Sequence, residues 1–279
     1  GILTSRLSSS MHLGAFEVDF KRHSELGDNL RASLILTVII SAVLAIFGKI
    51  ICLFTGTEVI GVLEMIIISV ISGTLAGILV TVVGVLVSIV CYRKFWDLDM
   101  VGAPAVTTIG DIVTLPFLVV TALIVMDLPF TGKAVLGAVV FVMIAAAFIS
   151  FKRGTRTMLD VLREGLPLLI PLSLLGITAG VLYTSRLESL IAAAAVIILI
   201  SPFMNGCGSI GGILTSRIGT EMHMGMIDPV LFPQKTVLKH FGENYIYSII
   251  FLPLMGAIAH FAAVLLGITT PGILLMVVI

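Results

Sequence analysis

The chain has 279 residues, of which 58% are hydrophobic and only 11% are charged, against about a quarter charged in an average soluble domain. Its mean hydropathy is +1.21 and its formal net charge is zero. This composition excludes a soluble enzyme, a disordered tail and a nucleic-acid-binding protein, because the apolar residues lie in long blocks and no net field attracts polyanions. We therefore expect no nucleic-acid partner and a multi-pass protein of the cell (plasma) membrane, in contact with the lipid bilayer.

Seven apolar segments are each long enough to cross about 30 Å of hydrocarbon, and an eighth begins near Thr270. None shows the alternating pattern of a membrane-spanning strand, so an all-α transmembrane helix bundle is predicted. The second segment is too long for one upright span, so it is expected either to tilt or to project into water at its cytosolic end. The seven segments are 31–54, 60–92, 103–127, 130–151, 166–184, 187–206 and 244–267.

The basic residues support this number of spans, because they gather on alternating connections. By the positive-inside rule, the richer set of connections is predicted to be cytosolic. That set holds Arg6, Lys21, Arg22, Arg31, Arg93, Lys94, Lys152, Arg153, Arg156, Arg163, Arg217, Lys235 and Lys239, and the other holds Lys49, Lys133 and Arg186. The stretch 152–164 is predicted to form an interfacial amphipathic helix on an anionic leaflet.

The chain contains an internal repeat. Residues 1–14 (GILTSRLSSSMHLG) and 212–225 (GILTSRIGTEMHMG) are identical at nine of fourteen positions, at an offset of 211, and Gly61–Met65 resembles Gly272–Met276 at the same offset. Five spans per copy would invert the second copy, but the extra span 130–151 restores its direction, so the copies are expected to be parallel.

The predicted fold is therefore a polytopic helix bundle built from two parallel repeats of a five-helix unit, joined by an extra span. On this interpretation the sequence is a fragment of a longer protein. The expected domains are 1–127, the C-terminal part of the first repeat; 128–165, the linker span with the interfacial helix; and 166–279, the N-terminal part of the second repeat.

The strongest candidate for chemistry is the segment from Asp99 to Asp111, which leads into the span 103–127. Asp111 lies about 12 Å inside that span, at about 1.5 Å per residue, and an acid at such depth needs a partner or a wet cavity. Thr107 and Thr108 add hydroxyl oxygens, and oxygen ligands with one carboxylate suit a hard cation, above all Mg²⁺. An ion pathway is favoured over the alternative, a protonated Asp111 bonded to a neighbouring helix.

The second candidate is the segment from Asn205 to Arg217, which has four glycines within seven positions. So many glycines favour an opened backbone over a regular helix, with close packing of small residues as an equal alternative. Gly208 and Gly211 are expected to lie against a pathway or a packed helix end, with Ser209 pointing toward the pathway.

Other features are assigned structural roles. Gly73 and Gly77 are predicted to form a small-residue packing face. His12 and His223, at equivalent positions of the repeat, are predicted to cap or lie at the interface rather than bind a metal. There is no P-loop, nucleophile elbow or zincin motif, so the protein is predicted not to be an enzyme and to use no organic cofactor.

The two candidate segments, from Asp99 to Asp111 and from Asn205 to Arg217, resemble motifs of the MgtE magnesium transport family. The resemblance is strongest to its archaeal and eukaryotic solute-carrier branch, in which the membrane domain is duplicated. The resemblance implies a five-helix membrane domain that functions in pairs with the pore between units, so one chain would be a pseudo-dimer, and it matches Asp111 to the family's pore aspartate. Ser209 departs from the family's usual Asn, and Met100 stands where a polar residue is common. The matching residues are Gly208 to Arg217 with Thr220 and Gly225, their first-copy counterparts Gly1 to Gly14, and Asp97, Asp99, Pro104, Thr107, Thr108 and Asp111.

The sequence thus predicts transmembrane transport of divalent cations, foremost Mg²⁺ as the transported ion, through a pathway between the two repeats. The predicted metal-interacting residues are Asp111, Thr107, Thr108, Ser209 and Asp99. Two alternatives stay open: a proton- or Na⁺-coupled secondary transporter of another solute, with Asp111 as the ion site, and a non-transporting membrane receptor or scaffold.

Overall fold

A computed structural model describes residues 2–14, 18–19, 21, 24–56, 60–185, 194–228, 230, 234–270 and 272–278, and these residues form helices and short connections without a strand. Seven of the helices are long and apolar enough to cross a membrane, so the predicted all-α fold is confirmed. The helices are α1 (Ile2–His12), α2 (Glu25–Thr55), α3 (Val62–Lys94), α4 (Leu98–Asp127), α5 (Phe130–Lys152), α6 (Arg156–Ser185), α8 (Ala194–His223), α9 (Lys235–Leu265) and α10 (Ile273–Val278).

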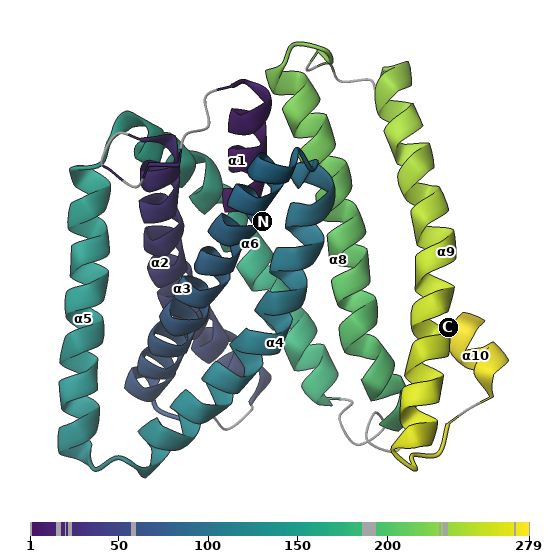
Figure 1. Ribbon diagram of the computed structural model, residues 1–279. Coiled ribbons are helices and arrows are strands. Elements are labelled where there is room, and N and C mark those ends of the chain that lie inside the picture. The colour runs from purple at the N-terminus through teal and green to yellow at the C-terminus, as the bar shows by residue number, and fades with distance from the viewer. Residues whose placement is uncertain are drawn as a thin grey trace.

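The long helices run alternately up and down in Figure 1, while the short α1 runs upward beside the upper half of α8. The C-termini of α3 and α5 and the N-termini of α6 and α9 lie at the top of Figure 1. We call this side of the bundle the basic end, because it carries Arg93, Lys94, Lys152, Arg156 and Lys235. The predicted alternation of basic residues therefore agrees with the helix directions. Arg22, Arg186 and residues 57–59 and 187–193 of the predicted loops and spans lie outside the described residues.

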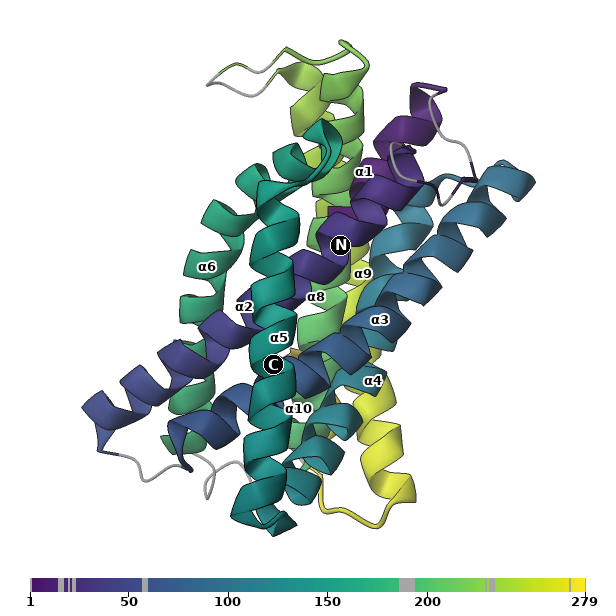
Figure 2. The ribbon, with the colours of Figure 1, turned by 90° about the vertical axis from the view of Figure 1, so that its left-hand side faces the viewer.

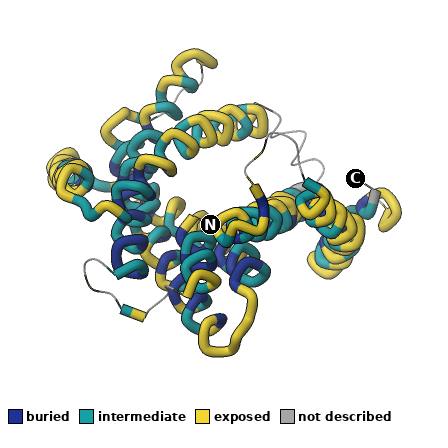
Figure 3. Tube along the Cα trace, turned by 90° about the horizontal axis from the view of Figure 1, so that it is seen from above, coloured by how far each residue is buried: buried dark blue, intermediate teal, exposed yellow. Residues whose placement is uncertain are grey.

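Two features of the bundle follow from helix length and composition. In Figure 2, α2 and α3 are steeply tilted against the upright α5, as expected for α3, whose 33 residues reach about 50 Å. The larger buried cluster joins α2, α3, α5 and α6 with the end of α4, and a smaller one joins α1, α2, α3 and α4. Seen from the basic end (Figure 3), the buried residues lie in the interior and the outer faces are mostly exposed. Those outer faces are apolar, which is what a surface in contact with lipid requires.

Helix ends are defined by specific caps. The Ser24 hydroxyl accepts from the Gly27 N–H at 3.1 Å to begin α2, and the Asp97 side chain accepts from the Asp99 N–H at 2.9 Å to begin α4. On the opposite side, Glu64 accepts from the Gly61 N–H at 2.8 Å and from Lys133 Nζ at 2.6 Å, which ties the start of α5 to the start of α3. These caps fix where each helix enters the bundle.

The internal repeat extends from the sequence motif to the helix boundaries. The helix α1 ends at His12 and α8 ends at His223, while α3 begins at Val62 and α10 at Ile273, each pair at an offset of 211. The left-handed glycines recur at the same offset, with φ of 69° at Gly14 and 72° at Gly225, and of 70° at Gly56 and 69° at Gly267. The turns after these helices are therefore built in the same way in both copies.

Two segments differ from their predicted form. Residues 156–165, expected to belong to an interfacial helix, are the first turns of α6 and are continuous with the predicted span 166–184. The Gly-rich stretch 205–212, expected to depart from a regular helix, lies within the uninterrupted helix α8. That prediction is wrong because the packing of α8 between its neighbours outweighs the weak helix propensity of glycine, about 1 kcal/mol per residue.

Glycines also allow α2 and α3 to pack closely. A Cβ at Gly73 would collide with the Ser41 hydroxyl, and a Cβ at Gly77 would lie 2.7 Å from Thr37 Cγ2. The Thr37 side chain cannot easily turn away, because its hydroxyl donates to the Ser33 carbonyl at 2.9 Å. The predicted packing face at Gly73 and Gly77 is therefore confirmed.

Replacing Gly77 by Leu is expected to push α2 and α3 apart and to lower the melting temperature of the purified protein by several degrees, since overpacking costs about 1–3 kcal/mol. Gly180→Leu is the matched control, because a Cβ at Gly180 meets no heavy atom within 4 Å. Equal melting temperatures of the two variants in detergent would contradict the close α2–α3 contact.

Candidate cation site between α4 and α8

The contact between α4 and α8 depends on one glycine. A Cβ at Gly212 would lie 2.8 Å from Ala103 Cβ, and a Cβ at Gly206 would lie 2.7 Å from Phe251 Cε1 on α9. Gly208 and Gly211, expected to lie against a pathway or a packed helix end, would carry a Cβ that meets no heavy atom within 4 Å. The glycines that pack are thus Gly206 and Gly212, and the small-residue alternative describes this stretch better than an opened backbone.

Below this contact a cluster of hydroxyl and amide groups joins the two helices. The Thr107 and Ser209 hydroxyl oxygens are 2.9 Å apart, and Thr107 donates to the Ala103 carbonyl at 2.7 Å. Asn205 donates from Nδ2 to Thr108 Oγ1 at 3.4 Å, and its Oδ1 accepts from Ser209 at 3.3 Å. Three predicted site residues, Thr107, Thr108 and Ser209, are therefore brought together with Asn205.

Asp111 lies one helical turn further along α4 than Thr107 and Thr108. Its side chain is exposed within the chain, and within the described residues no hydrogen bond or ion pair reaches it. It is 13 residues beyond Leu98, the first residue of α4, which is about 20 Å along the helix axis. The alternative of a carboxyl bonded to a neighbouring helix finds no partner in the described part of the chain.

An open polar cavity of about 500 Å³ lies at the basic end of the same two helices. Arg217 approaches two of its carboxylates, with Nη2 3.8 Å from Asp97 Oδ2 and Nη1 3.4 Å from Glu243 Oε2. His240 Nε2 is 2.9 Å from Glu221 Oε1. The charged and titratable side chains that line the cavity are Asp97, Asp99, Glu221, Glu243, His12, Arg217, Lys239 and His240.

Asp99 is the buried member of this group, with 3% of its surface exposed. Ser216 donates to Asp99 Oδ1 at 2.5 Å, and His12 Nε2 lies 3.7 Å from Asp99 Oδ2. His12 was expected to cap a helix or lie at the interface; it is the last residue of α1 and its side chain faces two carboxylates. No spacing along the chain could have indicated this, because His12 and Asp99 meet only when α1 packs on α4.

Equivalent residues of the two copies touch each other directly. The Ser5 and Ser216 hydroxyl oxygens are 3.3 Å apart, and the Ser9 and Thr220 hydroxyl oxygens are 3.4 Å apart. Both pairs join residues separated by 211 positions, between helices that run in the same direction (Figure 1). Two residues related by a rotation can touch each other only near the rotation axis.

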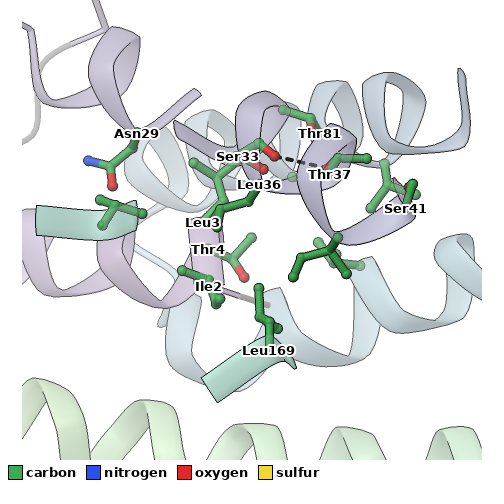
Figure 4. Close-up of a pocket in the computed structure, with 15 residues that line it drawn as sticks. Ile2, Leu3, Thr4, Asn29, Ser33, Leu36, Thr37, Ser41, Thr81 and Leu169 are labelled. Atoms are coloured by element: carbon green, nitrogen blue, oxygen red, sulfur yellow. Dashed lines mark hydrogen bonds between the residues drawn. The ribbon is translucent and has the colours of Figure 1, made fainter. Parts of the chain in front are cut away.

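A second cavity, of about 450 Å³, lies between α1, α2, α3 and α6 (Figure 4). A stripe of polar side chains four residues apart on α2, Asn29, Ser33, Thr37 and Ser41, lines it together with many apolar side chains. Asn29 Oδ1 is buried and accepts no hydrogen bond from the described residues. Among those residues no charged side chain lines this cavity, so a cation would find no compensating charge from them.

Residues 1–121 match the family model MgtE, described as a divalent cation transporter. The matched segment covers α1 to α3 and most of α4, and with them Asp97, Asp99, Thr107, Thr108 and Asp111. No curated protein and no solved structure matches the chain. The predicted resemblance is confirmed over these residues, and with seven membrane-capable helices the chain is a multi-pass membrane protein.

The α4–α8 contact can be tested with neighbouring glycines. Gly212→Leu is expected to separate Ala103 from α8 and to lower the melting temperature by several degrees, because a large side chain has no space there. Gly211→Leu on the next position should melt within about a degree of the unmodified protein, because its side chain enters open space. A larger loss in Gly211→Leu than in Gly212→Leu, measured by differential scanning fluorimetry, would show that α4 and α8 pack differently.

Proposed function

We propose, from the match of residues 1–121 to the MgtE divalent cation transporter model, that the protein moves divalent cations, foremost Mg²⁺, along the contact between α4 and α8. The observation that carries the proposal is the series of oxygen-bearing side chains on α4. It begins with the carboxylates of the polar cavity, continues through the Thr107–Ser209 pair, and ends at Asp111, which has no partner in the described residues.

The chemistry of these groups suits a hydrated Mg²⁺ ion. Mg²⁺ gives up its waters reluctantly and is usually held through one or two carboxylates, with several waters kept. Hydroxyl and amide oxygens at Thr107, Thr108, Ser209 and Asn205 can accept hydrogen bonds from those waters, while Asp111 supplies the negative charge. An unpaired carboxylate in a membrane-spanning helix costs about 2.5–3.5 kcal/mol on insertion scales, so its presence favours a functional role over a structural one.

We further propose that residues 1–127 and 166–279 are parts of two parallel five-helix repeats, connected by 128–165 and related by an axis along the membrane normal. The recurrence of helix ends and left-handed glycines at an offset of 211 supports this arrangement. The Ser5–Ser216 and Ser9–Thr220 pairs support an axis between α1 and α8. The chain would then be a pseudo-dimer whose pathway lies near that axis, as in other duplicated transporters.

Asp111→Asn should reduce Mg²⁺ flux into liposomes at least about tenfold, because the substitution keeps the size of the side chain but removes a charge whose attraction is several kcal/mol near a protein surface. The melting temperature should change little, since no hydrogen bond within the described residues depends on Asp111. Asp111→Glu should retain partial flux. Asp160→Asn, on α6 and outside both cavities described above, is the matched control.

Wild-type Mg²⁺ flux in Asp111→Asn would overturn the assignment. Flux that depends steeply on an imposed proton or Na⁺ gradient would favour a coupled transporter of another solute. An intact chain that moves no ion in liposomes would favour a receptor or scaffold.

The axis between α1 and α8 can be tested by cross-linking. In a background without Cys52, Cys91 and Cys207, the pair Ser5→Cys and Ser216→Cys should form an intramolecular disulfide under mild oxidation, because the two hydroxyl oxygens are 3.3 Å apart. The pair Ser5→Cys and Ser248→Cys, with the second residue on α9, should not. Mass spectrometry of tryptic peptides measures both yields, and equal yields would contradict the arrangement.

A further inference from the structure

The side chains of His12, Asp97 and Asp99 bring one nitrogen and two carboxylate oxygens within 4.8 Å of one another at the edge of the polar cavity. We propose that these three residues form a binding site for a borderline transition-metal dication, of the Mn²⁺, Co²⁺ and Zn²⁺ class, at the basic end of the pathway. The site shares Asp99 with the proposed function, but metal binding at it does not require transport.

The spacing of the three ligand atoms is close to what such an ion needs. His12 Nε2 lies 3.7 Å from Asp99 Oδ2 and 3.9 Å from Asp97 Oδ1. Ligands at the Zn²⁺ bond lengths in a tetrahedral site are about 3.3 Å apart. The two His12 distances exceed that spacing by about half an ångström, and all three ligand atoms lie within 4.8 Å of one another.

The buried Asp99 carboxylate points independently to a cation. One of its oxygens accepts from Ser216, but within the described residues no hydrogen bond reaches Oδ2, the oxygen that faces His12. Arg217, which lines the same cavity, approaches Asp97 and Glu243. A carboxylate that is 3% exposed needs a partner for each of its oxygens, and a dication between Asp99 and His12 would supply one at Oδ2.

The mixed ligand set decides the class of metal. Mg²⁺ is bound through oxygen ligands and waters, whereas imidazole nitrogen suits Zn²⁺ and other transition metals. The site is reachable, because the His12 side chain is 40% exposed and faces the open cavity, where water can complete the coordination. The cavity also holds four carboxylates against one arginine and one lysine, so its field attracts cations while the histidines are neutral.

The second copy of the repeat provides an internal comparison. His223, the counterpart of His12, has Nδ1 2.7 Å from the Gly219 carbonyl of its own helix. Among the described residues, His12, Asp97 and Asp99 form a group of three possible metal ligands. No such group includes His223 in the described part of the chain. The two histidines thus share a sequence context but differ in metal-binding surroundings, which makes His223 a matched control.

The experiment measures Mn²⁺ binding to the purified intact chain by electron paramagnetic resonance, with millimolar Mg²⁺ present to fill sites made of oxygen alone. The unmodified protein is expected to bind Mn²⁺ with nitrogen hyperfine coupling from one imidazole. His12→Asn should remove that coupling and weaken Mn²⁺ binding at least about tenfold, a typical cost of losing one ligand contact. His223→Asn should leave both readouts unchanged.

Three results would each overturn the proposal. The nitrogen coupling could persist in His12→Asn, it could be lost in His223→Asn, or it could be absent from the unmodified protein. Asp97→Asn is a second variant at a less buried position, and it should weaken Mn²⁺ binding without loss of the folded state. The two proposals can fail separately. Normal Mg²⁺ flux in Asp111→Asn would contradict the transport pathway but not this metal site. Wild-type Mn²⁺ binding in His12→Asn would contradict this metal site but not the pathway.

Discussion

The close approach of α4 and α8 at Gly212 and Ala103 is the contact on which the candidate site depends. Because Gly212 has no side chain, the two helices come near enough for short side chains to touch across the gap. Thr107 meets Ser209 on one side of this contact, and Asp99 meets Ser216 on the other. If α4 and α8 were further apart, the short serine and threonine side chains could not reach their partners across the gap. The oxygen atoms would then no longer form one series along α4.

The same helix α8 also touches α1, its counterpart in the repeat. The paired hydroxyls at this contact, Ser5 with Ser216 and Ser9 with Thr220, are small and polar on both sides. A surface that packs against its own copy must be self-complementary, and hydroxyl groups satisfy this requirement because each can donate or accept. Close helix packing and polar character therefore occur together where a central pathway would need both.

Residues at the 211-residue offset share helix boundaries but differ in their side-chain partners. Arg6 pairs with Glu164 at 2.8 Å, whereas the equivalent Arg217 lies between Asp97 and Glu243. His12 faces two aspartates, whereas His223 bonds to its own helix. Similar sequence at the two positions therefore does not lead to the same contacts, because each helix packs against different neighbours.

The sequence alone determined the helical class, the presence of seven membrane-capable segments, the alternation of basic ends and the repeat at an offset of 211, because these follow from hydropathy, charge and identity along the chain. It did not give the bounds of every helix, since the predicted span 187–206 ends well before α8 does, at His223. It also singled out Asp99, Thr107, Thr108, Asp111 and Ser209 as candidates. The tertiary structure decided which of them meet, and it replaced the opened backbone at 205–212 by a regular helix whose glycines serve packing. The meeting of His12 with Asp97 and Asp99 was equally beyond the sequence, because residues more than 80 positions apart become neighbours only through the packing of α1, α4 and α8. Periodicity describes one helix at a time, and a site shared between helices depends on their relative rotation and depth, which side-chain packing sets.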